Sequence, residues 1–280
     1  MAVTDNIVET RIAKTFGHFG EWLQGRVGTK GPVALISVQC PQFWVRVSRK
    51  KSESFQYADV LPCLPRDAMK ALFAALQQPH TGVFTVSSNM QFGAGLGAST
   101  ASLLAAARTI ADFGVQTDAL AKSIVAVEGA SDPLMYDAFD RLLWASRKAE
   151  ILDRFAAPPL FTVLGGMWGA RQKTNPNDQN FADISDLLKA WQTATSAKDH
   201  AKTAEIATES FRRTSELRHG GDDPTLGIAR DVKALGVIRA HTGSARGFLF
   251  KSDAAAQSGL NLLAEAGYSG VTTFQTGGTL

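Results

Sequence analysis

The chain has 280 residues, 45% of them hydrophobic and 20% charged, so it is long enough for two domains or one large one with a substantial core. Its 29 basic residues nearly balance 26 acidic ones, and a net charge of +3 gives little reason to expect a nucleic acid or an anionic membrane as a partner. No apolar run reaches about 18 residues, no signal peptide is recognisable, and Cys40 and Cys63 are too few for a disulfide framework, which together favour a cytoplasmic protein with free thiols.

The first third of the chain is rich in strand patterns. We predict strands over residues 11–16, 32–38 and 43–47, because β-branched and aromatic residues gather there between turns that contain glycine or proline. Residues 17–25 hold three glycines and Glu21 within an apolar stretch, which predicts a functional loop between the first two strands. A helix over residues 65–77 and a strand over residues 82–86 follow.

Residues 88–113 carry the strongest candidate for a functional motif. Gly93, Gly95 and Gly97 lie between the strand over residues 82–86 and an alanine- and leucine-rich helix. Glycine lets backbone N–H groups turn inward, and the first N–H groups of a helix favour an anion. This stretch therefore predicts a phosphate-binding loop.

Two other interpretations of the glycine stretch stay open. Residues 93–98 also fit the dinucleotide pattern G-x-G-x-x-[GA], although that motif needs a second parallel strand that ends in an acidic residue, and Asp112 lies inside a helical pattern instead. The glycines can also serve only the close packing of a helix. The hydroxyls of Ser99, Thr100 and Ser102 fit either a helix cap or contacts with phosphates and Mg²⁺.

A further helix is predicted from residue 117 or 118 onward, and another helical pattern follows Pro133 and includes Leu142 and Leu143. Between them, Glu128 and Asp132 offer hard oxygen ligands or a base for a site that holds Mg²⁺ and a nucleotide. Asp132 equally fits a helix N-cap followed by proline, and the sequence leaves both roles open.

The paired prolines at positions 158 and 159 predict a domain boundary, with domains at residues 1–155 and 156–280. Beyond it we predict strands over residues 160–164, 237–240, 247–250 and 271–274, a polar loop over 174–180, and helices over 183–193, 198–218, from 223, and over 253–266. Residues 240–247 contain His241, Thr242, Gly243, Ser244 and Arg246, and they fit either a plain hairpin turn or part of a site.

The ordered set of Gly20-Glu21, residues 95–99, Glu128 with Asp132, and residues 242–244 resembles the GHMP kinase superfamily over nearly the whole chain. Residues 17–25 and 240–243 are most similar to the L-threonine kinases of the propanediol-utilisation type, which serve cobalamin side-chain synthesis. The resemblance implies an α+β, two-domain architecture. Its N-terminal domain, residues 1–155, would be of the ribosomal-protein S5 domain 2-like type and its C-terminal domain, residues 156–280, ferredoxin-like, with ATP between them.

The resemblance also implies an ATP- and Mg²⁺-dependent kinase for a small hydroxylated substrate, best matched by L-threonine, with homoserine as an alternative. Asp132 would act as the base, Ser99 and Glu128 would bind Mg²⁺, and Lys14 lies near the place of a catalytic lysine found in some members. The expected ATP-binding residues are Ser88, Asn89, Gly93, Gly95, Leu96, Gly97, Ala98, Ser99 and Thr100. The expected substrate-binding residues are His18, Glu21, His241, Thr242, Gly243 and Ser244.

The sequence departs from the pattern of this superfamily at three positions. Gln91 stands where proline is usual, Ala98 stands where a first serine is usual, and Lys14 is one residue from the expected place. A non-catalytic module that binds a nucleotide or RNA is therefore the alternative of another class. Arg11, Arg246 and His18 are candidates to meet a substrate carboxylate, and the sequence indicates no oligomeric state.

Overall fold

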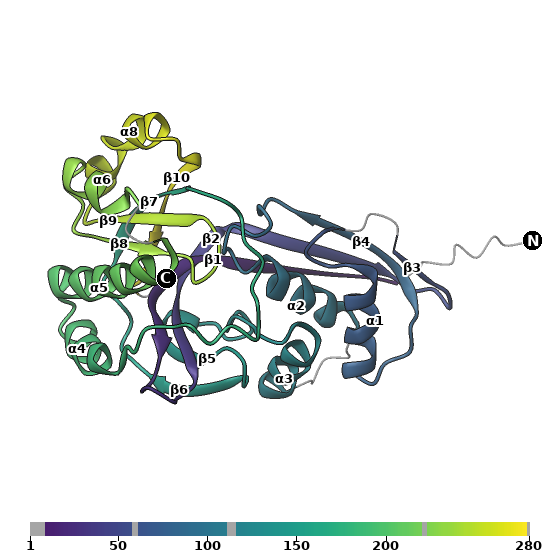
Figure 1. Cartoon of the computed structure of the whole chain (residues 1–280). Helices are drawn as coiled ribbons and strands as arrows, with labels where there is room; N and C mark the ends of the chain where they lie inside the picture. Colours follow the sequence, from purple (N-terminus) through teal and green to yellow (C-terminus); the bar gives the residue numbers. More distant parts are fainter. Residues whose placement is uncertain (1–8, 58–60, 111–115, 220–222, 279–280) are drawn as a thin grey trace, which may run out of the picture.

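The computed structural model describes residues 9–57, 61–110, 116–219 and 223–278 (Figure 1). The strands in this part of the chain are β1 (Thr10–Arg26), β2 (Val33–Lys50), β3 (Phe55–Tyr57), β4 (Gly82–Ser88), β5 (Leu142–Ala145), β6 (Glu150–Arg154), β7 (Phe161–Met167), β8 (Gly236–Arg239), β9 (Ala245–Phe250) and β10 (Ser269–Thr276). They form one sheet in the order β10-β7-β9-β8-β1-β2-β4-β3, with β5 attached to β2 and β6 to β5. The mixture of helices and strands confirms the predicted α+β class.

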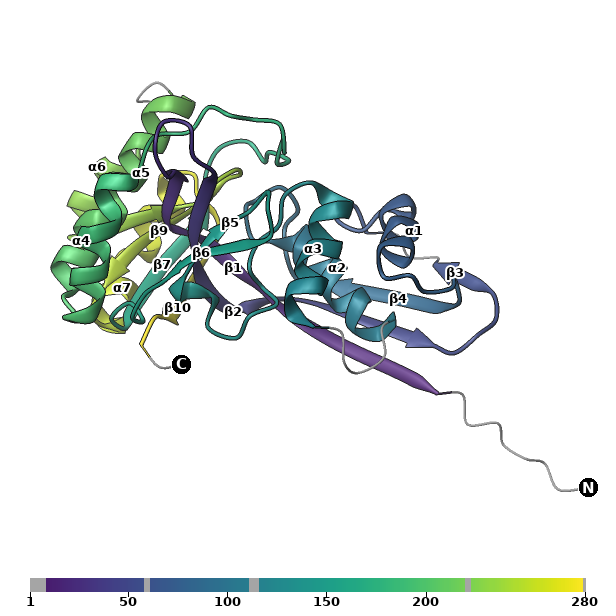
Figure 2. The same ribbon diagram turned by 90° about the horizontal axis from the view of Figure 1, so that it is seen from below.

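The long antiparallel hairpin of β1 and β2 runs through both halves of the molecule (Figures 1 and 2). At the end of the hairpin formed by the C-terminal half of β2, residues 45–50 pair with β4, and β4 pairs with β3. Strand β3 is parallel to β4, and helix α1 (Arg66–Ala75) lies between them in the chain. Toward the other end of the hairpin, β1 pairs with β8 through Glu21 and Arg239. The hairpin therefore connects the two halves within one continuous sheet.

The helices cover the sheet in two groups. Helix α2 (Ala98–Ile110) packs on β1 and β2, and α1 and α3 (Thr117–Glu128) pack beside it. Helix α5 (His200–His219) packs on β8 and β1, with α4 (Ser185–Ser196) against it, and α6 (Thr225–Asp231) lies next to β8. Helix α7 (Asp253–Gln257) packs on β7, β9 and β10, and α8 (Leu260–Glu265) packs on β10. Figure 2 shows α1, α2 and α3 grouped on one half and α4, α5 and α6 on the other.

Helix α2 is the most deeply buried element of its half. All of its residues except Ser99 and Arg108 are buried, because the helix is enclosed by the hairpin on one side and by α1 and α3 on the other. A helix rich in alanine and leucine suits such a central place, and its alanines let the neighbouring elements approach closely. The start of this helix, at Ala98, therefore has a fixed position.

The predicted loop over residues 17–25 is wrong, because β1 continues through it to Arg26. The pairing with β2 shifts register near Gly17 and again around Glu21, so the strand contains bulges. Gly20, at φ +70°, adopts a backbone conformation that favours glycine. Nearly all of these residues are buried, which removes the alternation of apolar and polar residues that marks a half-exposed strand.

Two predicted helices also differ from the structure. The pattern after Pro133 forms a 3₁₀ turn, Phe139–Arg141, followed by strand β5, in which Leu142 and Leu143 are buried. The helix predicted over residues 253–266 divides into α7 and α8. Strands β3, β5 and β6 were not predicted. Strand β3 has only three residues, β5 lies in the stretch predicted as a helix, and β6 is mostly charged and exposed. The boundary at residues 155–156 stays a prediction.

Candidate active site

The glycine stretch forms a tight loop between β4 and α2. Gly93, Gly95 and Gly97 have φ values of +75°, +82° and +73°, a backbone region that residues other than glycine rarely adopt. A Cβ atom on Gly95 would lie 2.2 Å from Cβ of Ala240, and one on Gly243 would lie 2.5 Å from the carbonyl carbon of Ala94. The loop is therefore pressed against the segment that joins β8 and β9, and α2 begins directly after it.

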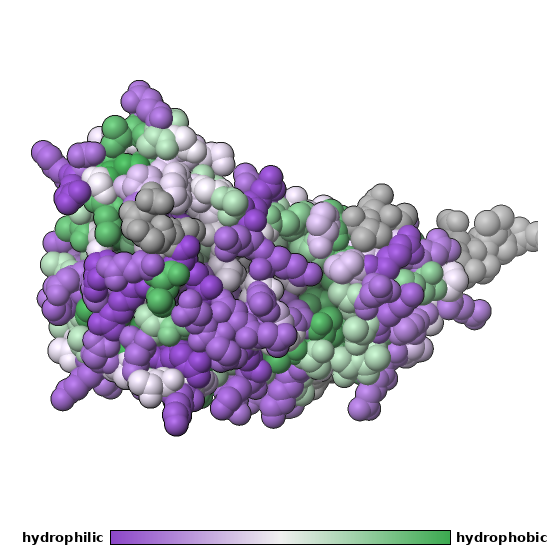
Figure 3. Space-filling model, viewed as in Figure 1, coloured by the Kyte–Doolittle hydropathy of each residue, from purple (hydrophilic) through white to green (hydrophobic). Residues whose placement is uncertain are grey.

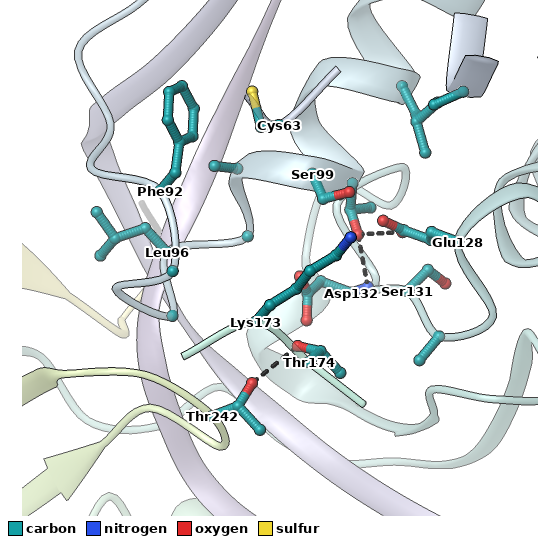
Figure 4. Close-up of a pocket in the computed structure, with 18 of the residues that line it drawn as sticks. Cys63, Phe92, Leu96, Ser99, Glu128, Ser131, Asp132, Lys173, Thr174 and Thr242 are labelled. Carbon is teal, nitrogen blue, oxygen red and sulfur yellow. Dashed lines mark hydrogen bonds between the residues drawn. The ribbon is translucent and has the colours of Figure 1, made fainter. Parts of the chain in front are cut away.

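A cavity of about 750 Å³ opens beside this loop. Its walls come from segments that are far apart in the sequence. They include the glycine loop, the start of α2, the start of α1 and the residues before it, the end of α3 and the residues after it, residues 146–147, residues 171–174, and the segment after β8. Figure 4 shows side chains from these segments directed toward a shared space. On the face shown in Figure 3, hydrophilic residues predominate and apolar ones are visible in the hollow near α2. A concave site of this size with a few polar groups suits a small ligand.

Glu128, at the end of α3, lies beside the hydroxyls at the start of α2. Its Oε1 atom accepts a hydrogen bond of 2.5 Å from Oγ1 of Thr100, and the same hydroxyl accepts a bond of 3.2 Å from the backbone N–H of Asp132. Burial raises the pKa of Glu128 to about 8, although bonds from Ser99 and Thr100 oppose this rise. Ser99 itself is exposed to the cavity. The structure thus brings Ser99, Thr100, Glu128 and Asp132 together.

Asp132 is not a helix cap, because residues 133–138 form turns and no helix begins there. Its Oδ2 atom lies 3.3 Å from Nε2 of His18, a residue of β1. Nδ1 of the same ring lies 3.5 Å from Oε1 of Glu21 and 3.2 Å from the carbonyl oxygen of Gly20. Despite burial, the two carboxylates raise the pKa of His18 to about 9, and His18 holds the pKa of Asp132 below its usual range against the effect of burial.

A polar strap, residues 171–174, crosses one side of the cavity. The backbone N–H of Gln172 donates to the carbonyl oxygen of Gly93, and the Thr174 and Thr242 hydroxyls lie 2.8 Å apart. Arg171 and Lys173 line the cavity, and Figure 4 shows the Lys173 side chain reaching into it. No sequence pattern indicated a role for these cations or for Arg147, which also lines the cavity. Only Arg171 and Lys173 stand just before the predicted polar loop.

His241 is nine-tenths buried in the cavity wall. Its ring stacks on Phe181, with centroids 4.5 Å apart and planes at 3°. Neither ring nitrogen forms a hydrogen bond with the described residues. Burial, together with the charges of Arg147 and Arg218, lowers the pKa of His241 to about 3, so the imidazole is neutral.

Several residues predicted for the site lie elsewhere. The Lys14 ammonium is stacked over the rings of Phe16 and Trp44 on an exposed part of β1, outside the cavity wall. The side chains of Ser88 and Asn89 hydrogen-bond to backbone atoms of the β2 segment. Glu21 reaches the cavity only through His18, and Gly243 and Ser244 lie behind its wall.

Arg11 and Arg246 are also outside the cavity wall. Arg11 contacts Glu9, and Arg246 forms a buried ion pair of 2.8 Å with Asp223. The predicted functional roles of all these residues stay predictions.

The dinucleotide interpretation is not supported by the order of the strands. The described chain passes from β4 through α2 into α3, whereas a dinucleotide fold would need a parallel strand after α2. The neighbours of β4 are β2 and β3, both earlier in the chain. Asp112, the acidic residue considered for that motif, lies outside the described residues. Among the described residues, no helix is both long and apolar enough to cross a membrane.

No protein-family model and no curated protein matches the sequence. Solved structures do match. The phosphomevalonate kinase of Streptococcus pneumoniae is 14% identical, with 96% of this chain and 98% of that chain covered at a TM-score of 0.66. An L. major mevalonate kinase in complex with R-mevalonate is 12% identical, with 99% and 98% covered at 0.66. The homoserine kinase of Cytophaga hutchinsonii is 16% identical, with 99% and 96% covered at 0.62.

Identities this low establish the fold and not the activity. The match extends over almost the entire length of each chain, so both halves of the sheet and the helices on them are included. The chain therefore has the α+β fold of GHMP kinases.

Proposed function

We propose that this chain is a GHMP-type kinase that uses ATP and Mg²⁺ to phosphorylate a hydroxyl of a small substrate. The observation that carries the proposal is that one cavity collects the glycine loop, the start of α2, Glu128 and Asp132. Phosphoryl transfer depends mainly on positioning and on neutralising phosphate charge, and these groups supply both. The likeness to solved kinases makes this chemistry the first to test.

ATP phosphates fit the end of the cavity formed by the glycine loop. Backbone N–H groups of this loop and of the first turn of α2 favour an anion, and the loop is held in place by its contacts with β1 and with the segment after β8. Arg171 and Lys173, from the segment that packs beside Gly93, add positive charge to the cavity. We assign these two side chains to contacts with the phosphates.

Ser99 and Glu128 suit Mg²⁺ because both offer hard oxygen ligands. Among the described residues, no cationic side chain forms an ion pair with Glu128, and burial raises its pKa to about 8. A nearby cation would relieve this cost of burying a carboxylate. Bound there, Mg²⁺ would supply positive charge to the phosphate groups.

Asp132 is the base that we assign to the acceptor hydroxyl. The hydroxyl oxygen forms a bond to the γ-phosphorus while the bond from that phosphorus to the bridging oxygen breaks, and ADP leaves with the electron pair. The hydroxyl proton passes to the Asp132 carboxylate, whose pKa lies below its usual range. Ser131, Ser146 and His241 line the neighbouring wall and are available to the acceptor.

L-threonine is the acceptor that we propose first, and homoserine is the alternative. Both are small hydroxylated amino acids, in keeping with the resemblance of residues 17–25 and 240–243 to L-threonine kinases. One structural neighbour is described as a homoserine kinase. Both ring nitrogens of the neutral His241 imidazole are buried and lack a hydrogen-bond partner among the described residues, and a polar group of such a substrate against this wall would supply one.

A non-catalytic nucleotide-binding module is the second candidate. The observation in its favour is Ala98, which lines the cavity at the first residue of α2 and offers no hydroxyl. Such a module would bind Mg-ATP without transferring the phosphoryl group.

The proposal is tested by ADP release with a panel of hydroxylated substrates that includes L-threonine, L-serine, L-homoserine and a sugar. Asp132→Asn should lower turnover by about 100-fold or more, as expected for loss of a general base. Ser99→Ala should raise the Mg²⁺ concentration required. Asp231→Asn and Ser258→Ala, two exposed positions outside the cavity, are the matched controls.

The outcomes separate the candidates. ADP release by the wild type that Asp132→Asn lowers and that Ser99→Ala shifts to higher Mg²⁺ concentrations supports the kinase. Thermal stabilisation by Mg-ATP with no ADP release on any substrate supports the non-catalytic module. Turnover by Asp132→Asn at the wild-type rate would remove the role assigned to Asp132.

A further inference from the structure

His18 occupies an unusual place between two carboxylates. Its Nε2 atom faces Asp132 at 3.3 Å and its Nδ1 atom faces Glu21 at 3.5 Å. The side chains of His18 and Glu21 are almost completely buried, whereas the Asp132 side chain is 23% exposed and lines the cavity. A line of polar groups thus leads from the interior of β1 to the reaction site.

The charges of this line favour a protonated imidazole beside an ionised Asp132. Burial raises the pKa of Glu21 to about 8, so this carboxyl group keeps its proton more readily than usual. Asp132, which faces the cavity and the other side of the imidazole, has a lowered pKa. Among the possible protonation states, an imidazolium on His18 paired with a carboxylate on Asp132 is therefore favoured.

The surrounding backbone prevents the imidazole from moving away. The backbone N–H of His18 donates to the carbonyl oxygen of Leu96 in the glycine loop. A Cβ atom on Gly97 would lie 2.6 Å from Cδ2 of His18, so the loop packs directly on the ring. Gly20, two residues later, lies so close to Arg239 that a Cβ would be 2.5 Å from its carbonyl carbon. The loop therefore packs on the ring, and the β1 backbone that follows His18 packs against strand β8.

We infer that His18 is a positioning residue for phosphoryl transfer, which orients Asp132 and keeps it ionised so that it can accept the proton of the acceptor hydroxyl. This inference rests on the proposed kinase function. The proton moves from the hydroxyl to Asp132 as the O–P bond forms and the bond to ADP breaks, and His18 keeps its own proton throughout. Glu21 holds the far side of the ring.

This role differs from the substrate contact that the sequence analysis assigned to His18 and Glu21. The family resemblance suggested Lys14 as a candidate for the catalytic lysine that some members have in this region. The Lys14 ammonium lies over the Phe16 and Trp44 rings instead. His18, on the same strand, is the cation that contacts Asp132.

A shared metal ion is the rival explanation for this cluster, because ligand atoms of His18, Glu21 and Asp132 all lie within 4.8 Å of one another. The geometry favours an ion pair. A metal would take one ring nitrogen, whereas here the two nitrogens face different carboxylates. Metal binding is therefore an outcome to be excluded by the test.

The first experiment is an NMR titration of the histidine ring nitrogens in the full chain without substrate. We expect the His18 ring to carry protons on both nitrogens at neutral pH and to lose one near pH 9. Asp132→Asn should lower this pKa by at least about one unit, since it removes the nearest negative charge. A His18 ring that is neutral at pH 7, or that titrates identically in Asp132→Asn, would overturn the inference.

Other charged groups must be considered in the same titration. Glu21 faces the ring from β1, Arg239 pairs with the Glu21 backbone from β8, and His241 and Glu128 act on Asp132 from the cavity wall. The glycine loop contributes no titratable side chain at residues 93–97. Addition of a chelator distinguishes the ion pair from a bound metal. Loss of a metal would change the His18 ring signals, whereas a chelator would leave the signals of an ion pair unchanged.

The second experiment is kinetic. His18→Gln should lower kcat by roughly tenfold to 100-fold with the KM for ATP changed by less than about twofold, because only the base is disturbed. The fall of wild-type kcat near pH 9 should disappear in this variant. His18→Lys, which keeps the positive charge, should recover part of kcat. His200→Gln removes a histidine outside the cavity and should behave as the wild type.

The two experiments separate the inference from the proposed function. If no substrate releases ADP, the kinase proposal fails, while the NMR titration still reports whether the ion pair exists. If turnover is found but His18→Gln retains the wild-type kcat and pH profile, the kinase stands and the positioning role is wrong. A His18→Gln variant that does not fold is replaced by the Asp132→Asn titration, which leaves His18 in place.

Discussion

The Cβ position of Gly97 lies 2.6 Å from Cδ2 of His18, so the glycine loop and the ion pair behind it pack as one unit. The same position is 3.1 Å from Oδ2 of Asp132. A side chain at residue 97 would therefore displace both members of the pair. The loop that we assign to ATP and the base that we assign to the acceptor are connected by direct contact.

Gly97→Ala should consequently reduce folding stability by more than the strain of its backbone conformation alone implies. At φ +73° any L residue is strained by about 1 kcal/mol, and the contact with His18 adds a clash that should bring the loss of folding stability to about 3 kcal/mol. Chemical denaturation measures this loss. Gly28→Ala is the matched control, because Gly28 has φ +81° but nothing within 4 Å of its Cβ position. Equal losses for both variants would mean that the contact with His18 has no energetic weight.

The pH dependence of stability should report the buried imidazolium. The pKa of His18 rises from 6.5 in the unfolded chain to about 9 in the folded one, so the folded state binds more protons between these values. The stability from this group is complete below pH 6.5 and is lost as the pH rises through about 9. Glu21, whose pKa rises from 4.5 to about 8, contributes in the same direction.

Urea denaturation at a series of pH values tests this expectation. His18→Gln should reduce the decline of stability between pH 6.5 and about 9, whereas His200→Gln should leave it unchanged. A decline of the same steepness in His18→Gln would assign the effect to other groups.

Removal of the carboxylate at Glu128 should act mainly through Mg²⁺. Glu128→Gln keeps the size of the side chain and can still accept the hydrogen bond from Thr100, but it loses the negative charge that suits a divalent cation. We expect the Mg²⁺ concentration for half-maximal ADP release to rise by about tenfold or more, the usual scale for weakening a metal site. Titration of Mg²⁺ at saturating ATP measures it. An unchanged Mg²⁺ requirement would contradict the assignment of this ligand.

Local sequence signals were enough to locate the loop at residues 93–97. Three glycines between a short strand and an apolar helix specify a turn with positive φ values, and this chemistry is independent of distant parts of the chain. The hydroxyls and carboxylate that meet at the start of α2 were also recognised, because Ser99, Thr100 and Glu128 occur next to helix ends.

Features that depend on contacts between distant parts of the chain could not be predicted from the sequence. Residues 134–143 have apolar spacing that fits a helix, but Leu142 and Leu143 are buried in a strand that pairs with β2 and β6. This difference removes the helix-cap interpretation of Asp132, which required a helix, whereas its role as a base stays a proposal. Likewise, nothing in the local pattern of His18 indicates that it meets Asp132, and the cations of the strap reach the cavity only through the folded chain.

Arg147 should control the mobility of the chain that follows the strap. Its Nε atom donates to the carbonyl oxygen of Pro176 at 2.7 Å, and a second nitrogen donates to that of Asp178 at 3.3 Å. Each such bond contributes about 1 kcal/mol, so loss of both in Arg147→Met should speed amide exchange at Asp178 and Asn180 by about 30-fold, equal to about 2 kcal/mol. Hydrogen exchange resolves these amides.

The amide of Gln172, which donates to the Gly93 carbonyl, tells whether the strap moves with that chain. If it does, exchange at Gln172 rises together with that at Asp178, and the KM for ATP should rise because Arg171 and Lys173 lose their fixed positions. Arg212→Met is the control, since Arg212, an exposed residue, contacts only Glu209 and Glu216 of α5 in the described residues. Unchanged exchange in Arg147→Met would show that the contacts of the strap with Gly93 and Thr242 are sufficient to hold it.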